Sequence, residues 1–133
     1  CSSDLDIEKT KSVATSFAKK AKPGDCFCLF GELGAGKTEF SRAFIQAVCG
    51  AVKVTSPTYN ILLSYEGEHI VNHFDLYRIK DPSELEEIGF SEALMNGINL
   101  IEWPQVAGDL IPQNAKKIEI QIISEGTRRI ICS

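Results

Sequence analysis

The sequence contains no long apolar run, since its longest apolar stretches are short segments such as residues 26–30. A membrane-spanning helix needs about 20 predominantly apolar residues, so no such helix and no membrane partner is predicted. Internal repeats, low-complexity tracts and a linker long enough to divide the chain are also missing. With 133 residues, of which 44% are hydrophobic, the chain is expected to fold as one domain over residues 1–133.

Basic residues are too few to dominate the surface, because the formal net charge is −4. Binding to a nucleic-acid backbone requires a concentrated lysine and arginine face, so strong independent nucleic-acid binding is not expected. The five cysteines form no recognisable disulfide framework. Cys26 and Cys28 are expected to share one face of a strand as small apolar side chains, since zinc ligation requires wider spacing and further ligands. Reduced thiols and a cytoplasmic location follow from this composition.

One motif carries most of the functional information. Residues Gly31-Glu32-Leu33-Gly34-Ala35-Gly36-Lys37-Thr38 match the pattern G-x-x-x-x-G-K-[ST], known as the P-loop. Glycines let backbone N–H groups turn toward a nucleotide's phosphates, the lysine reaches the β and γ oxygens, and the threonine hydroxyl binds Mg²⁺. The motif predicts that residues 32–38 bind nucleotide.

The flanking residues support this interpretation. The apolar segment 26–30 is typical of a strand, and residues 37–49 carry Phe40, Phe44, Ala47 and Val48 at helical spacing. The N-terminus of that helix would point its unpaired N–H groups at the same phosphates. The alternative is that the glycines only form a tight turn between a strand and a helix, which the required context makes much less favourable.

The first residues, Cys-Ser-Ser-Asp, resemble both a processed lipoprotein and a protein that has lost its initiator methionine. No lysine followed by an apolar leader and a small-residue cleavage site is visible. The second explanation is expected, because a nucleotide-binding motif without a disulfide framework is typical of the cytoplasm.

The remaining periodicity predicts alternating helices and strands. Asp81 is expected to cap a helix with Pro82 at its first position and Glu84 as the capping-box acid. Further elements are expected as a helix at 7–21, a short strand at 52–54, a hairpin of 61–65 with 70–75, a helix at 91–96, a strand at 98–101, and a final antiparallel pair of 116–123 with 127–132. The predicted fold class is α/β, a three-layer α/β/α P-loop NTPase fold with a mixed central sheet and a C-terminal antiparallel hairpin. A nucleotide is expected at the carboxyl ends of the strands.

Two acids follow apolar strands and are candidates for the Mg²⁺ shell or for orienting a water molecule. Asp75 follows residues 70–74, and Glu102 follows residues 98–101. A strand that buries its backbone and ends in a carboxylate suits this role, although either acid could simply cap a loop. Residues 55–59, Thr-Ser-Pro-Thr-Tyr, could act as a switch that senses the γ-phosphate or could be an ordinary loop.

Taken together, these segments resemble the bacterial TsaE (YjeE) family, the small ATPase required for threonylcarbamoyladenosine formation on tRNA. The resemblance covers most of the chain, in the family's order and spacing. The segments that carry it are Lys22-Pro23-Gly24-Asp25, Leu33-Gly34-Ala35-Gly36-Lys37-Thr38, Ser56-Pro57-Thr58-Tyr59, His73-Phe74-Asp75-Leu76-Tyr77-Arg78 and Ile101-Glu102-Trp103-Pro104. Two departures are mild, since Glu32 replaces the usual Asp and Gln105 stands where an acid is common.

The resemblance implies that Thr38 and one or both of Asp75 and Glu102 bind Mg²⁺, and that Thr55 belongs to a switch loop near the γ-phosphate. Lys37, Asp75 and Glu102 are the implied catalytic residues. Trp103 is expected to contact the nucleotide or, alternatively, to be a core tryptophan. His73 could polarise a water molecule, but packing or hydrogen bonding on the sheet is the favoured interpretation.

The resemblance further implies an ATPase that docks on the threonylcarbamoyl-transferring subunit and its paralogous partner (TsaD and TsaB type). ATP hydrolysis would reset that complex between rounds, and tRNA would be contacted through the partners. No arginine finger is obvious, although Arg78, Arg128 and Arg129 are candidates. Two alternatives stay open, a small-molecule P-loop kinase and a nucleotide-binding module without turnover. A GTP switch is less favoured because no Asn-Lys-x-Asp segment is present.

Overall fold

The computed structural model describes residues 2–5, 7–31, 37–54, 61–124 and 127–132. Its elements follow one another as β1 (Ser2–Leu5), α1 (Ile7–Lys20), β2 (Cys26–Phe30), α2 (Lys37–Cys49), β3 (Leu62–Tyr65), β4 (Val71–Asp75), α3 (Ser83–Glu87), α4 (Phe90–Asn96), β5 (Ile98–Glu102), the 3₁₀ turns η1 (Pro104–Val106) and η2 (Gly108–Leu110), β6 (Lys116–Ser124) and β7 (Thr127–Cys132). None of the helices within these ranges has both the length and the apolar character needed to cross a membrane.

The seven strands within these ranges join one mixed sheet in the order β1-β7-β6-β2-β5-β4-β3. Its centre is parallel, since β2 pairs in parallel with both β5 and β6, and β5 pairs in parallel with β4. Both edges are antiparallel, with β3 against β4 on one side and β6, β7 and β1 on the other. The mixed sheet and the C-terminal hairpin are therefore confirmed.

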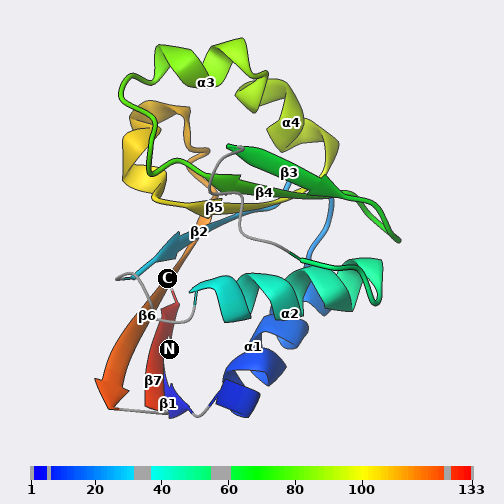
Figure 1. Ribbon diagram of the computed structural model, residues 1–133, viewed down its shortest axis with the longest axis vertical. Helices are drawn as coiled ribbons and strands as arrows, with labels where there is room; N and C mark the ends of the chain where they lie inside the picture. Colours follow the sequence, from blue (N-terminus) through cyan, green and yellow to red (C-terminus); the bar gives the residue numbers. More distant parts are fainter. Residues whose placement is uncertain (1, 6, 32–36, 55–60, 125–126, 133) are drawn as a thin grey trace.

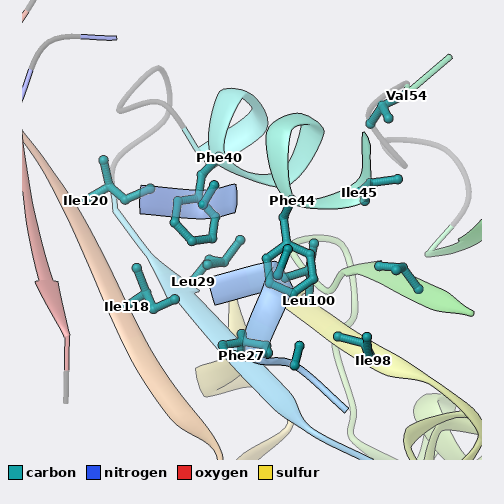
Figure 2. Packing of buried hydrophobic residues seen from close by; sticks show 14 of the residues in the cluster. Phe27, Leu29, Phe40, Phe44, Ile45, Val54, Ile98, Leu100, Ile118 and Ile120 are labelled. Atoms are coloured by element: carbon teal, nitrogen blue, oxygen red, sulfur yellow. The ribbon is translucent and has the colours of Figure 1, made fainter. Parts of the chain in front are cut away.

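Helices cover both faces of the sheet, as expected for three layers (Figure 1). On one face α1 and α2 pack against alternate residues of β2, so that Phe27 and Leu29 lie in one buried cluster with Phe40 and Phe44 (Figure 2). The Phe27 and Phe44 rings meet edge to face, with 5.2 Å between their centroids. Alternate residues of β2 share one face of the strand, and residues four apart in α2 share one face of the helix. These two faces meet at the cluster.

The opposite face is covered by α3, α4 and the 3₁₀ turns. Cys26 and Cys28 point to this side and belong to a second cluster with Phe74, Leu85 and Phe90. Both thiols are buried and free, which confirms that the two cysteines share a face as small apolar residues. Their mutual hydrogen bond, together with burial, raises the pKa of Cys26.

The expected strand at 52–54 is wrong. These residues follow the end of α2 without joining the sheet. The turn is held by local hydrogen bonds, in which the N–H of Val52 donates to the Gly50 carbonyl (2.7 Å) and the Gln46 amide donates to the Val52 carbonyl (3.3 Å). Val52 and Val54 alternate with a polar residue, as in a strand, because both side chains pack against the core. The alternation therefore reflects burial and not strand pairing.

Other boundaries differ by about a residue. The helix expected to begin at Pro82 begins at Ser83, yet the predicted capping bonds are present. The Asp81 carboxylate accepts from the Ser83 N–H at 3.0 Å, and the Glu84 carboxylate accepts from the Asp81 N–H at 3.2 Å. Strand β1 was not predicted, and it adds Ser2–Leu5 to the edge formed by β7.

Candidate nucleotide-binding site

The candidate site lies where three parallel strands end. Because β2, β5 and β4 run in the same direction, their carboxyl ends meet at one edge of the sheet. Glu102 at the end of β5 is in register with Leu29 of β2 on one side and with Asp75 of β4 on the other. After β2 the chain enters the glycine-rich segment and re-emerges at Lys37, the first residue of α2.

Lys37 is buried at this edge, with only 5% of its surface exposed. Its Nζ lies 4.3 Å from the centroid of the Trp103 ring, a cation–π contact. The Tyr77 ring lies beside the same indole, with 4.9 Å between ring centroids. Trp103 is half-buried, so it is neither a fully buried core residue nor a free surface residue.

The backbone at Trp103 is strained. With φ of 58° and ψ of 49°, it is the only non-glycine residue in the left-handed region among the residues that the structure describes. That conformation costs roughly 1–2 kcal/mol for an L-residue. The turn lets the chain leave β5 and enter η1 at Pro104 while the indole stays over Lys37.

The two predicted acids lie side by side in different environments. Glu102 is 6% exposed, and its Oε2 lies 2.6 Å from Nε2 of His73. Asp75 is half-buried, and burial raises the pKa of its carboxyl. The neighbouring Glu102 adds to that increase, whereas the Tyr77 N–H, which donates to Oδ1 at 3.1 Å, and the charges of His73 and Lys37 oppose it.

The donor set at this edge fits Mg²⁺ better than a transition metal. Within the described ranges no cluster of three or more His, Cys, Asp and Glu side chains is present to form an all-protein cage. Magnesium does not require one, because it prefers oxygen ligands, retains water and is held by one or two carboxylates together with substrate phosphates. Asp75 and Glu102 are adjacent, and the charge of Glu102 disfavours ionisation of Asp75. A divalent cation bound between the two carboxylates would relieve this repulsion.

The structure therefore brings together four of the predicted site residues, Lys37, Asp75, Glu102 and Trp103. Thr38 follows Lys37 in the first turn of α2 and is half-buried. The other predicted nucleotide-binding residues, which are Glu32, Leu33, Gly34, Ala35, Gly36 and Thr55, lie outside the described residues.

The contact between His73 and Glu102 was not predicted from sequence. His73 hydrogen-bonds on the sheet as favoured, but its partner is one of the two candidate acids. The only signal in the sequence was a histidine next to Asn72 inside a strand that is otherwise apolar up to Asp75. Of the candidate arginines, Arg78 follows β4, whereas Arg128 and Arg129 lie on β7, two strands away from β2.

Comparison with known proteins agrees with this arrangement. The model of the family described as threonylcarbamoyl adenosine biosynthesis protein TsaE matches residues 5–131. Proteins named tRNA threonylcarbamoyladenosine biosynthesis protein TsaE are similar to the chain. The one from Rickettsia typhi is 40% identical over 97% of this chain and 90% of its own length, and that from Bacillus subtilis is 37% identical over 95% and 80%. The crystal structure of Bacillus subtilis YdiB superposes with a TM-score of 0.80 at 30% identity, covering 98% of this chain and 82% of that one. The chain belongs to the TsaE family.

Proposed function

We propose that this protein is a Mg²⁺-dependent ATPase that acts in the formation of threonylcarbamoyladenosine on tRNA. The names of its relatives support the pathway. The observation that carries the ATPase is the convergence of Lys37, Asp75 and Glu102 at the carboxyl ends of parallel strands, directly after a P-loop sequence.

In this proposal Lys37 binds the β and γ phosphate oxygens of ATP. Thr38 and one or both carboxylates, Asp75 and Glu102, hold Mg²⁺. When bound, Mg²⁺ would supply neutralisation of the phosphate charge. One of these two carboxylates orients the attacking water, and the P-loop N–H groups stabilise charge that develops on the γ-phosphate.

Trp103 lies at the edge of the same site and is proposed to contact the bound nucleotide. Its indole follows a left-handed backbone turn and contacts the Tyr77 ring, with 4.9 Å between the ring centroids. A half-buried indole offers an apolar surface and a π face next to the phosphate-binding lysine.

The proposed partners are the threonylcarbamoyl-transferring subunit and its paralogue, with hydrolysis resetting their complex between rounds. The net charge of −4 supports a division of labour in which the partners bind tRNA. Turnover by the isolated chain is expected to be slow until an arginine, either Arg78 beyond the end of β4 or one from a partner, is positioned at the γ-phosphate.

Phosphate release from Mg-ATP tests the proposal, measured for the protein alone and with the two partner subunits. Lys37→Met and Glu102→Gln are expected to abolish turnover, and the exposed matched controls Lys20→Met and Glu92→Gln are expected to retain it. Phosphate transfer only when a small acceptor is added would favour a kinase instead. Nucleotide binding without any turnover would identify a binding module.

A further inference from the structure

The pair formed by His73 and Glu102 is the most buried polar contact at the site. The two side chains are 1% and 8% exposed, and 2.6 Å separates Nε2 from Oε2. They come from adjacent parallel strands, β4 and β5, where Glu102 is in register with Asp75 rather than with His73. The Glu102 side chain therefore extends diagonally across the strand pair to reach the imidazole.

The chemistry of the contact fixes the hydrogen on one nitrogen. A carboxylate that holds Mg²⁺ or orients water acts in its ionised form, which only accepts hydrogen bonds, so in the proposed site Nε2 carries the hydrogen that bonds to Oε2. The distance is at the short end for a hydrogen bond to a charged group. The other ring nitrogen, Nδ1, is buried and has no hydrogen-bond partner within the described part of the chain. Among the described residues, Glu102 is thus the only hydrogen-bond partner of the His73 ring.

Core packing does not explain a histidine at this position. Two residues earlier, on the same face of β4, Val71 is completely buried in the apolar cluster under α2. An apolar residue at position 73 would extend that cluster without the cost of burying a polar ring, which is about 1–3 kcal/mol when a group lacks its partners. His73 instead makes one bond to a carboxylate, and its Nδ1 has no partner among the residues that the structure describes.

We propose that His73 is a positioning residue for ATP hydrolysis, whose Nε2–H holds Oε2 of Glu102 and leaves Oε1 for the Mg²⁺ or the attacking water. This inference rests on the proposed ATPase function. A glutamate has three side-chain torsions, and a fixed partner for one oxygen removes most of that freedom before substrate binds. His73 itself contacts neither the nucleotide nor the ion.

NMR spectroscopy of the free protein tests the contact without any nucleotide. The sequence has two histidines, so His69→Gln leaves His73 as the only imidazole. The expected result is a hydrogen on Nε2 that exchanges slowly with water, and that exchanges rapidly when Glu102→Ala is added. A hydrogen found only on Nδ1, or a Nε2 hydrogen unaffected by Glu102→Ala, would overturn the proposal.

Two amide variants test the positioning role. In His73→Gln the amide nitrogen reaches the place of Nε2, whereas in His73→Asn it reaches only the place of Nδ1, and His73→Leu supplies no donor. We expect kcat to fall about 10- to 100-fold in the Asn and Leu variants and to be largely retained in the Gln variant. KM and the affinity for a non-hydrolysable ATP analogue should change little in all three, and thermal unfolding of each variant measures its stability.

The outcomes separate this inference from the function on which it rests. If the wild-type protein hydrolyses ATP and the Gln variant loses as much kcat as the Leu variant, the positioning role is wrong and the ATPase function stands. The same holds if kcat follows stability across the three variants, because His73 would then be only a structural residue. If the wild-type protein shows no turnover alone or with its partners, both proposals fail.

Discussion

Replacing Asn99 with alanine should destabilise the protein strongly, although Asn99 lies at the opposite end of β5 from the candidate site. The residue is completely buried. The two hydrogens of its amide nitrogen are shared among the carbonyls of Asp25 (3.1 Å), Leu94 (2.9 Å) and Gly97 (3.0 Å), and its carbonyl accepts from the Asn72 amide at 3.0 Å. One side chain thus ties the start of β2, the end of α4 and the neighbouring strand β4 to β5.

The size of the stability loss depends on which hydrogen-bond partners of Asn99 keep another hydrogen bond in the variant. The Asp25 carbonyl still accepts from the backbone N–H of Asn99, and the Gly97 carbonyl still accepts from the N–H of Gly24, both at 2.9 Å. The carbonyl of Leu94, in the last turn of α4, loses its side-chain donor. With about 1 kcal/mol for each net hydrogen bond and a further penalty for a buried polar group left unpaired, the expected loss is about 3 kcal/mol. That is a large part of a typical stability of about 5–15 kcal/mol.

Urea unfolding measures this loss, with the fluorescence of Trp103, the sole tryptophan in the sequence, as the probe. The matched control is Asn96→Ala, the same substitution three residues earlier at an exposed position of α4, which should change the free energy of unfolding by less than about 0.5 kcal/mol. If Asn99→Ala costs no more than this control, the buried amide network does not stabilise the sheet and the reasoning is refuted.

Three further predictions concern the site and its supports. Burial and the charge of Glu102 raise the pKa of Asp75 above its ordinary value of 3.8, so its contribution to stability is present below that value and is lost as pH rises through the folded pKa. Asp75→Asn should therefore raise the melting temperature at neutral pH without Mg²⁺ or nucleotide, and this gain should disappear in strong acid; an unchanged difference across pH would contradict it. Gly97→Ala should destabilise the fold, because a Cβ there would lie 2.6 Å from the Ile70 carbonyl oxygen, and chemical denaturation would measure the loss; unchanged stability would show that β5 tolerates the shift. Lys37→Met should alter the emission of Trp103 in the free protein, since the ammonium group lies 4.3 Å from the ring, and an unchanged spectrum would argue against the contact in solution.

Much of the fold could be predicted because its signals are local. The strand before the P-loop and the helix after it have apolar residues at periods of two and 3.6, and the structure places both at the predicted bounds, Cys26–Phe30 and Lys37–Cys49. The acids at the ends of β4 and β5 were found in the same way, since each ends a segment rich in apolar residues that the structure buries.

Elements defined by distant partners could not be predicted from such signals. Strand β1, Ser2–Leu5, has no apolar alternation and is a strand because β7 offers it an open edge. Residues 52–54 show the opposite case, since Val52 and Val54 are apolar like a strand but pair with none of the described strands. Whether each segment becomes a strand depends on whether another strand lies next to it, and the sequence of one segment does not show which segment that is.

The contact between His73 and Glu102 was beyond sequence analysis for a related reason, because it depends on β4 lying next to β5. Once that pairing is set, Asn72 faces Asn99 and Asp75 faces Glu102 in one register. The first pair is bonded directly at 3.0 Å on the face toward α4, 27 residues apart in sequence. A slip of one residue between the two strands would turn Glu102 to the other face of the sheet and away from His73 and Lys37. The amide network at one end of the strands therefore sets the geometry of the carboxylates at the other end, and the stability of the core and the arrangement of the site depend on the same register.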